Sequence, residues 1–321
     1  MERKLNVVFK GEAGVDAGGV SREFFFLLSE MFSPDHGMFE IINERYWFNK
    51  STAESSLLFS MLGTIVGLAI FNGVMLPVRF PIVLFKKLMK KPLTLDDLAE
   101  IEPDVHHTLK DLQQMKESGE DVSAVGLTFC VSYTVFDALK VVQLKEGGDK
   151  IDVTNESLDE YISLYVKWAL TDSIAGPYSA FERGYNKLCA RDVFQMFTPD
   201  EMSIIVSGEE VFDWSALKYE AKYIDGYTAE SRAVVWFWEV FDELSEEQKV
   251  KFLLFSTGTD KAPVGGLGEV GLVIQRTADP TKLPVAHTCF NIFALPDYQS
   301  KEELRRRLLI SLENTIGFGL K

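Results

Sequence analysis

Cysteine is scarce in this sequence of 321 residues. Cys130, Cys189 and Cys289 are the only three, they lie far apart, and none belongs to a Cys-x-x-Cys pair. Such spacing provides neither the disulfide framework of a small secreted domain nor the ligand pattern of a zinc site. Residues 1–4 also lack the character of a secretory signal. We therefore expect a reducing intracellular compartment, namely the cytoplasm, with the nucleus left open.

Positive charge is also in short supply, with 33 Lys and Arg against 48 Asp and Glu and a net charge of -15. Nucleic acids and anionic membranes bind clustered cations, so neither partner is expected, and an acidic surface suits a basic protein partner better. Arg305, Arg306 and Arg307 form one basic run. Glu302 and Glu303 precede Arg306 and Arg307 by four residues, which favours an ion-paired, solvated helix face.

Residues 55–78 contain no charged side chain, and about 20 apolar residues are enough to cross a membrane. However, Ser60, Gly63 and Gly67 interrupt the run and Pro77 ends it. This pattern favours a helix buried inside a helical domain, where the glycines allow close packing. A membrane span is the less favoured alternative.

Two further patterns bear on cofactors. The glycine-rich residues 11–19 lack the Gly-Lys-Ser/Thr ending of a phosphate-binding loop. His106 and His107 are adjacent and would point apart on a helix, with no third metal ligand evident. We therefore expect no metal, no nucleotide and no organic cofactor.

The chain is long enough for more than one domain, and its 46% hydrophobic content supports substantial cores. Helical patterns dominate the first part, with a small sheet expected around residues 127–144. A break at Ser207-Gly208-Glu209-Glu210 marks a domain boundary. After it, one helix is predicted by an apolar stripe, the next by a capping box Ser245-x-x-Gln248 with Gly258 at its end, and the last by a cap at Ser300. The stripe contains Val234, Phe237, Trp238, Phe241 and Leu244. Residues 1–210 carry 20 basic and 32 acidic side chains, and the remainder 13 and 16, so the acidic excess lies mainly before the boundary.

Two predicted helices of the first part have informative faces. On the helix opened by Pro103, Val105, Leu109 and Leu112 share one face, which by pattern alone favours ordinary core packing. Asn155 is expected to cap the other helix, whose apolar positions cover well over half of its circumference, more than the ~100° stripe that one core needs. A second surface therefore uses this helix. Its apolar residues are Leu158, Tyr161, Ile162, Leu164, Tyr165, Val166, Trp168 and Ala169.

The segment from Leu283 to Tyr298 contains Cys289. Prolines at 284 and 296 restrict the backbone at both ends, and the apolar run after the cysteine predicts a strand. His287 is two residues from Cys289, so an extended backbone would place both side chains on one side, where imidazole could favour the thiolate. A buried, inert Cys289 remains the alternative, because free cysteine is often buried.

The longer string Leu-Pro-x-x-His-Thr-Cys-Phe-Asn, followed by Leu-Pro-x-Tyr and a C-terminal Gly-Phe-Gly, closely resembles the active-site region of HECT-type ubiquitin ligases. The resemblance runs from Val7 to Lys321, and among these ligases it is closest to the subgroup of the papillomavirus oncoprotein-associated ligase. Three earlier motifs support it: Gly11-Glu12-x-Gly14-Val15-Asp16-x-Gly18-Gly19-Val20-Ser21-x-Glu23-Phe24-Phe25, Gly67-Leu68-Ala69-Ile70, and Thr257-Gly258-Thr259-Asp260-x-Ala262-Pro263-Val264-Gly265-Gly266.

The resemblance implies an α+β, bilobal fold. Residues 1–207 would be a larger, mostly helical N-lobe with a small β-sheet that docks a ubiquitin-conjugating enzyme. Gly208, Glu209 and Glu210 would be a hinge. Residues 211–321 would be a smaller α/β C-lobe carrying the catalytic cysteine. The implied docking groove contains Val105, Leu109, Leu112, Tyr161 and Tyr165, with Tyr161 replacing a phenylalanine common in the family.

The implied activity is that of a ubiquitin-protein ligase, which accepts ubiquitin as a thioester on Cys289 and passes it to a substrate lysine. The resemblance assigns Phe318, on a glycine-flanked tail, to the step that modifies lysine. A tail packed onto the domain is its alternative role. His287 would stabilise the thiolate or orient the loop, and Thr288 would donate a hydrogen bond to the developing oxyanion.

Two other functions are kept open. A cysteine hydrolase of the ubiquitin pathway would use Cys289 and His287, although the sequence offers no clear Asn or Asp to orient the imidazole. A non-catalytic interaction module would bind partners through its hydrophobic grooves. The chain begins close to Val7, where many family members have a further helix and a substrate-recruiting region. We therefore expect an isolated ligase domain or a shortened form, with its protein substrate recruited by regions outside this chain.

Overall fold

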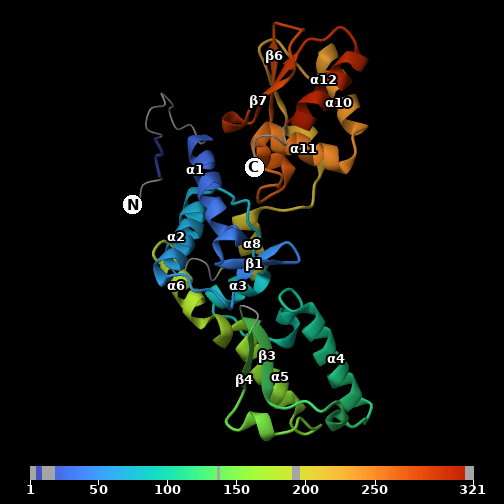
Figure 1. Ribbon diagram of the computed structural model, residues 1–321. Coiled ribbons are helices and arrows are strands. Elements are labelled where there is room, and N and C mark those ends of the chain that lie inside the picture. Colours follow the sequence, from blue (N-terminus) through green and yellow to red (C-terminus); the bar gives the residue numbers. More distant parts are fainter. Residues whose placement is uncertain (1–4, 9–18, 136–137, 190–195, 315–321) are drawn as a thin grey trace. The chain divides into compact units, whose positions relative to one another are not determined.

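The computed structural model of this chain describes residues 5–8, 19–135, 138–189 and 196–314 (Figure 1). The chain divides into two compact units. We call residues 28–71 and 78–206 the helical unit, and residues 1–27, 72–77 and 207–321 the cysteine unit. The main division falls one residue from the predicted end of the N-lobe. Residues 5–8, 19–27 and 72–77 are nevertheless grouped with residues 207–314, and the functional lobe bounds remain a prediction.

The helical unit consists mainly of α-helices with two short β-hairpins. One hairpin is made of β1 and β2 and the other of β3 and β4, both antiparallel. The helices are α2 (Ser56–Asn72), α3 (Ile82–Leu88), α4 (Pro103–Glu117), α5 (Leu158–Leu170), α6 (Ala175–Tyr185) and α8 (Pro199–Ser207). The strands are β1 (Phe39–Ile42), β2 (Arg45–Phe48), β3 (Cys130–Val135) and β4 (Ala138–Gln143). Short 3-10 turns are η1 (Glu30–Phe32), η2 (Pro34–His36), η3 (Leu95–Leu98), η4 (Val122–Val125), η5 (Gly148–Lys150) and η6 (Asp172–Ile174).

An aromatic cluster forms the core of the helical unit. Its rings pack edge-on or tilted, with centroids 5.2–6.2 Å apart, and each side chain is almost completely buried. Such pairs are stabilised beyond the burial of their area. The cluster contains Phe32, Phe39, Phe48, Phe59, Phe80 and Phe181.

Glycine allows α2 and α6 to approach closely. A Cβ added at Gly63 would lie 2.0 Å from the carbonyl oxygen of Phe181, and one added at Gly184 would lie 1.8 Å from that of Ser60. Any side chain at either position would force the helices apart. The predicted buried helix with packing glycines is therefore confirmed. No helix in the described part of the chain has both the length and the apolar character that crossing a bilayer requires.

The β3–β4 hairpin packs against one face of α5. Phe129 contacts Tyr161 and Tyr133 contacts Trp168, with ring centroids 5.6 and 5.5 Å apart. The sequence assigned Asn155 as the cap of α5, and this is wrong. Asn155 instead accepts a hydrogen bond from the Val122 N–H at 2.8 Å, and α5 starts three residues later.

The cysteine unit combines helices with a four-stranded sheet in the order β5-β6-β8-β7, in which β7 alone runs antiparallel to its neighbour. Its helices are α1 (Gly19–Ser29), whose residues to Leu27 belong to this unit, α9 (Trp214–Glu220), α10 (Arg232–Asp242), α11 (Glu246–Thr257) and α12 (Lys301–Asn314). The strands are β5 (Lys222–Ile224), β6 (Val273–Thr277), β7 (Val285–His287) and β8 (Ile292–Pro296), with 3-10 turns η7 (Leu267–Val270) and η8 (Thr288–Phe290).

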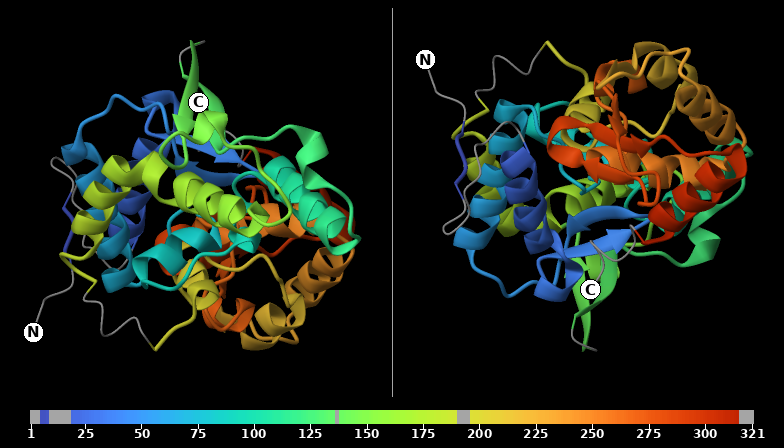
Figure 2. Two further views of the ribbon diagram at one scale, coloured as in Figure 1. Left: turned by 90° about the horizontal axis from the view of Figure 1, so that it is seen from below. Right: turned by 90° about the horizontal axis from the view of Figure 1, so that it is seen from above.

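The core of the cysteine unit lies between helices α9 to α12 and the sheet, which are drawn in yellow to red in Figure 2. The predicted stripe of α10 is buried, and Phe237 packs against Phe293 of β8 with centroids 5.0 Å apart. A capping box between Ser245 and Gln248 starts α11, and Gly258 ends it at a φ of 77°, as predicted. With a helical unit and a smaller α/β unit, the α+β fold class is confirmed.

Candidate active site on the cysteine turn

Cys289 lies in the connection between two antiparallel strands. β7 pairs with β8, with His287 opposite Ile292. Thr288–Phe290 form one turn of 3-10 helix, and Asn291 ends that turn in the left-handed region at a φ of 51°. We call residues 288–291 the cysteine turn. Phe290 is 55% exposed, whereas Thr288 and Asn291 are half-buried.

Helix α12 and Tyr298 hold the segment that leads into β7. The Tyr298 hydroxyl donates to the Lys282 carbonyl at 2.7 Å, and the Ser311 hydroxyl donates to the Pro284 carbonyl at 3.2 Å. Arg307 also donates to the Lys282 carbonyl at 3.1 Å. Burial raises the pKa of Tyr298 to about 12, so its hydroxyl keeps its proton at neutral pH. Helix α12 and Tyr298 therefore fix the backbone of residues 282–284, which lead into β7 and the cysteine turn.

Helix α11 ends beside the cysteine turn. A Cβ added at Gly258 would lie 3.5 Å from the Thr288 Cβ, which is an ordinary contact distance. The Thr288 side chain is half-buried. Its predicted hydrogen bond to an oxyanion remains a prediction.

His287 is exposed and is the last residue of β7. The prediction that the His287 and Cys289 side chains lie on one side requires an extended backbone through both residues. The backbone is not extended there, because the chain turns into the 3-10 helix directly after His287. The role of His287 in stabilising the thiolate or orienting the loop therefore remains a prediction, and the extended backbone that supported it is absent.

The other two cysteines belong to the helical unit. Cys189 is buried, with its sulfur 3.8 Å from the carbonyl oxygen of Gly67. Burial raises the pKa of the Cys189 thiol to about 11, which disfavours the nucleophilic thiolate. Cys130 is half-buried on β3. Cys289 is the one cysteine in the sequence of the cysteine unit.

The residues predicted to be a hinge are hydrogen-bonded within the cysteine unit. Gly208 has a φ of 77°, and a Cβ there would lie 2.6 Å from the Lys261 Cβ. Glu209 and Ala262 exchange two backbone hydrogen bonds of 2.8 and 2.9 Å, and Glu210 pairs with Lys261. A hinge motion would have to accommodate or break these contacts. Phe318, the other predicted residue of the transfer step, lies outside the described residues.

The predicted docking residues lie on α4 and α5 of the helical unit. Val105 is half-buried, whereas the other four are less than 10% exposed. Tyr161 and Tyr165 contact each other with centroids 6.2 Å apart, and the Tyr165 hydroxyl donates to Glu102 at 2.7 Å. Burial, followed by the Glu102 carboxylate, raises the pKa of Tyr165. These residues therefore support the core, and their docking role remains a prediction.

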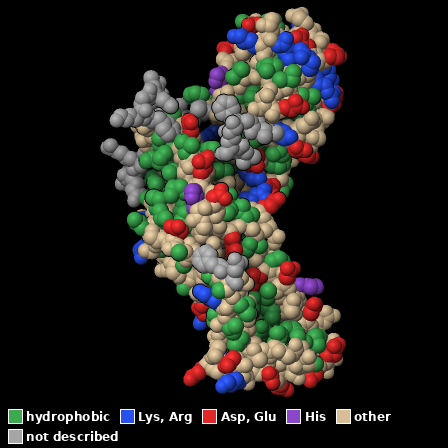
Figure 3. Space-filling model, in the orientation of Figure 1, with side chains coloured by type: hydrophobic (Ala, Val, Ile, Leu, Met, Phe, Trp, Pro, Cys, Tyr) green, Lys and Arg blue, Asp and Glu red, His purple; other side chains and the backbone are tan. Residues whose placement is uncertain are grey.

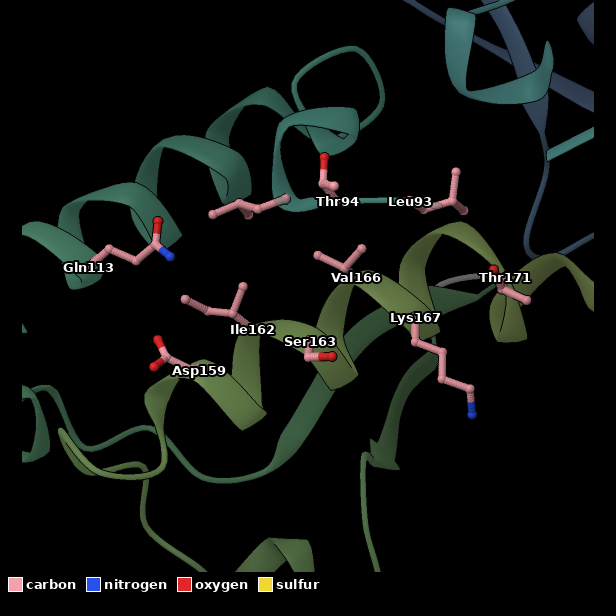
Figure 4. A pocket seen from close by; sticks show the side chains of 10 residues that line it. Leu93, Thr94, Gln113, Asp159, Ile162, Ser163, Val166, Lys167 and Thr171 are labelled. Carbon is pink, nitrogen blue, oxygen red and sulfur yellow. The ribbon is translucent and has the colours of Figure 1, made fainter. Parts of the chain in front are cut away.

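A pocket of about 450 Å³ opens between α4, α5 and η3 (Figure 4). Gln113 of α4 lies across from Ile162 and Val166 of α5, while Asp159 and Lys167 supply opposite charges at its margin. Hydrophobic side chains are also exposed over this part of the helical unit in Figure 3. The second surface expected of α5 thus includes Ile162 and Val166, which are not among the predicted docking residues.

The predicted basic run on α12 is ion-paired in two of its three positions. Arg307 pairs with Glu303 at 2.9 Å, as the spacing predicted, and Arg305 pairs with Glu243 of α10. His106 and His107, the adjacent histidines, lie 3.6 and 3.7 Å from the carboxylates of Asp96 and Asp111.

The protein thus combines a helical unit with a smaller α/β unit, and the hairpin turn of the α/β unit contains Cys289. Comparison with known sequences identifies the family. The family model described as HECT-domain (ubiquitin-transferase) matches residues 25–321. This chain belongs to the HECT-domain family.

Individual relatives agree with this assignment. The chain is 39% identical to human "Probable E3 ubiquitin-protein ligase HERC4" over 99% of this chain and 30% of that protein. It is 37% identical to mouse "Probable E3 ubiquitin-protein ligase HECTD2", over 100% of this chain and 43% of that protein. Its identity to Chaetomium thermophilum "E3 ubiquitin-protein ligase RSP5" is 34%, over 99% and 40% respectively. The chain thus spans less than half the length of these relatives. None of the three is named for a papillomavirus oncoprotein, so the subgroup remains a prediction.

Two residues of the site had no role in the sequence argument. Asn291 was part of the quoted motif, and its place before a predicted strand is a signal for a left-handed turn residue. Arg22 contacts the cysteine turn from 266 positions away, as described below. No local pattern indicates such a contact.

Proposed function

We propose that this chain is a ubiquitin ligase that carries ubiquitin as a thioester on Cys289. One observation carries the proposal: in a chain of the HECT-domain family, the one cysteine of the cysteine unit lies in a hairpin turn. His287 and Phe290, which lie on either side of this cysteine along the chain, are exposed, and Thr288 is half-buried.

The reaction has two steps. In the first, the Cys289 thiolate attacks the carbonyl carbon of the thioester between ubiquitin and a conjugating enzyme. A new C–S bond forms, the old C–S bond breaks, and the conjugating enzyme leaves as a thiolate. In the second, a lysine amine attacks the new thioester. A C–N bond forms, the Cys289 thiolate leaves, and the amine loses a proton to solvent.

The free energies of the two steps make the overall reaction run toward the modified lysine. Exchange of one thioester for another is nearly balanced, whereas formation of an amide is downhill. Cysteine suits the role because a few per cent is already thiolate near neutral pH and sulfur is a strong nucleophile. Thr288, His287 and Phe318 are the proposed supporting residues, with Phe318 acting in the step that modifies lysine.

The proposed protein partners are a ubiquitin-conjugating enzyme and ubiquitin. The conjugating enzyme docks on the face of α4 and α5 around Val105, Leu109, Leu112, Tyr161 and Tyr165. This face and Cys289 belong to different units. Because reacting atoms must come within roughly 3–3.5 Å, residues 208–210 act as the hinge that lets Cys289 approach the conjugating enzyme.

Substrate choice and location are further proposals. Regions outside this chain recruit the protein substrate, which is supported by relatives more than twice as long as this chain. The proposed location is the cytoplasm, with the nucleus left open.

A non-reducing gel tests the proposal. The chain is mixed with ubiquitin-loaded conjugating enzyme, and each sample is divided and run with and without dithiothreitol. We expect a ubiquitin adduct that dithiothreitol removes, and no adduct in Cys289→Ala. In Cys289→Ser any adduct is an oxygen ester, so it forms more slowly and survives dithiothreitol. Cys189→Ala is the matched control and keeps the adduct.

The same gel separates the two alternatives. A cysteine hydrolase would release free ubiquitin without an adduct, and an interaction module would bind the donor without either product. Phe318→Ala separates the two steps of the ligase. We expect it to retain the thioester and lose lysine modification, and equal loss of both steps would contradict its assigned role.

A further inference from the structure

Asn291 ties the C-terminal end of the cysteine turn to the neighbouring part of the sheet. Its side-chain N–H donates to the Val270 carbonyl at 2.6 Å, and its own carbonyl accepts from the Val273 N–H at 2.9 Å. Its backbone N–H donates to the Thr288 carbonyl at 3.4 Å. Asn291 thus contacts both the junction of η7 with β6 and the residue before Cys289.

Arg22 contacts the same turn from the first part of α1. One guanidinium nitrogen, Nη1, donates to the Thr288 carbonyl at 3.1 Å and to the Asn291 Oδ1 at 2.8 Å. Arg22, Thr288 and Asn291 all belong to the cysteine unit. Hydrogen bonds from a charged donor are stronger than neutral ones. Together the two acceptors flank residues 289 and 290 along the chain.

Asn291 suits this arrangement for two reasons. The left-handed conformation at a φ of 51° is one that Asn tolerates better than most side chains. Its amide also provides a donor and an acceptor at once, and both are used here, toward Val270 and Arg22 respectively. The amide is therefore engaged away from His287, and the reaction steps described above assign it no chemical role.

We propose that Asn291 and Arg22 are positioning residues for Cys289. Asn291 sets the end of the cysteine turn, and Arg22 links the Asn291 side chain to the Thr288 carbonyl. The inference rests on the proposed ligase function, because it concerns the attack of Cys289 on a thioester. Displacement of a reacting group by about 1 Å can cost on the order of 100-fold in rate.

Substitutions at position 291 separate the backbone from the side chain. Asn291→Gly keeps the left-handed backbone without strain and removes both amide contacts. Asn291→Asp keeps an acceptor for Arg22 and removes the donor to the Val270 carbonyl. At position 22, Arg22→Gln removes the charge, and Arg22→Lys keeps it with a flexible donor. Arg305→Gln is the matched control, since Arg305 is an exposed, ion-paired arginine of α12 in the same unit.

The first measurement is the single-turnover rate of thioester formation at increasing concentrations of ubiquitin-loaded conjugating enzyme. For Asn291→Gly we expect the maximal rate to fall by about 10- to 100-fold. For Arg22→Gln we expect a fall of about 3- to 10-fold, with partial rescue in Arg22→Lys. The half-saturating concentration should stay unchanged in all four variants, and Arg305→Gln should match the wild type.

The second measurement distinguishes positioning from folding. A variant that merely destabilises the protein would show a lower thermal midpoint and a lower active fraction by titration, with a normal rate per active molecule. We expect a normal active fraction and a reduced rate per active molecule. A normal rate per active molecule in Asn291→Gly would overturn the proposal.

A double-mutant cycle tests the link between the two residues. Because Arg22 acts partly through the Asn291 side chain, Arg22→Gln should slow the reaction less in an Asn291→Gly background than in the wild type. Fully independent effects would overturn the link. If the wild type itself formed no thioester, the proposed function would fail. Normal loading in every variant would instead leave the function intact and remove only the inference.

Discussion

Lys87 is a buried lysine on α3, outside the proposed site. Its ammonium donates to the Thr171 hydroxyl at 3.1 Å and lies 4.3 Å from the centre of the Tyr178 ring. Burial, followed by the nearby Lys90 charge, lowers the pKa of Lys87 to about 8 from an ordinary value of 10.5. Between these two pH values the folded protein binds fewer protons than the unfolded chain.

This difference predicts a pH-dependent stability. Because the unfolded chain binds more protons, the free energy of unfolding should rise between about pH 8 and pH 10.5. Lys87→Met removes the effect, so wild type should gain up to about 3 kcal/mol over the variant across this interval. Denaturant titrations at several pH values measure it, with Lys140→Met correcting for loss of a surface charge. A constant difference between wild type and Lys87→Met would contradict the shifted pKa.

At the scale of elements, the sequence predicted helix ends well where a residue caps the backbone of its own helix. The capping box at Ser245, the glycine end of α11 and the Ser300 cap of α12 all form as expected. The β1–β2 hairpin escaped prediction because its turn places Asn43 and Glu44 at positive φ without the usual glycine. Asn155 failed as a cap because a distant backbone N–H competes for its side chain.

The α4–α5 pair carries a prediction about docking. Val105 is half-buried, so Val105→Asp changes the exposed face with little damage to the core. We expect the half-saturating concentration of conjugating enzyme to rise about tenfold, or ~1.4 kcal/mol, at an unchanged maximal loading rate. Leu57→Asp, an exposed apolar residue on α2, is the matched control. Equal half-saturation in both variants would argue against this face.

Buried docking candidates need a different interpretation. Leu109 is only 2% exposed, so Leu109→Ala should cost about 2–5 kcal/mol of stability in addition to any loss of docking. Tyr161 and Tyr165 are similarly buried. The Val105 substitution therefore reports on docking more directly than the other positions.

At the scale of the whole molecule, the proposed reaction depends on residues 207–210. Replacing Ser207 to Glu210 with prolines stiffens this segment, and it also removes the Glu209 N–H that bonds to Ala262. Because proline cannot adopt the φ of 77° seen at Gly208, the segment must change its path. We expect slower thioester formation on Cys289 with unchanged affinity for the conjugating enzyme.

Two measurements check the hinge prediction. Equilibrium binding of the conjugating enzyme reports on the helical unit, and single-turnover loading reports on delivery of Cys289. Alkylation of Cys289 by a small reagent controls for damage to the cysteine turn, because it requires no motion toward a partner. Loading at the wild-type rate would refute the hinge.

The sequence by itself determined the family, the α+β class and most helices, because motifs, periodicity and caps are local signals. It also selected Cys289 as the nucleophile, which remains a prediction. The tertiary structure alone decided which face of α5 is buried, that residues 5–8 and 19–27 group with residues 207–314, and that the chain turns directly after His287. It also brought Arg22 to Thr288 and Asn291. Contacts between residues hundreds of positions apart depend on the packing of whole elements, and no local pattern records them.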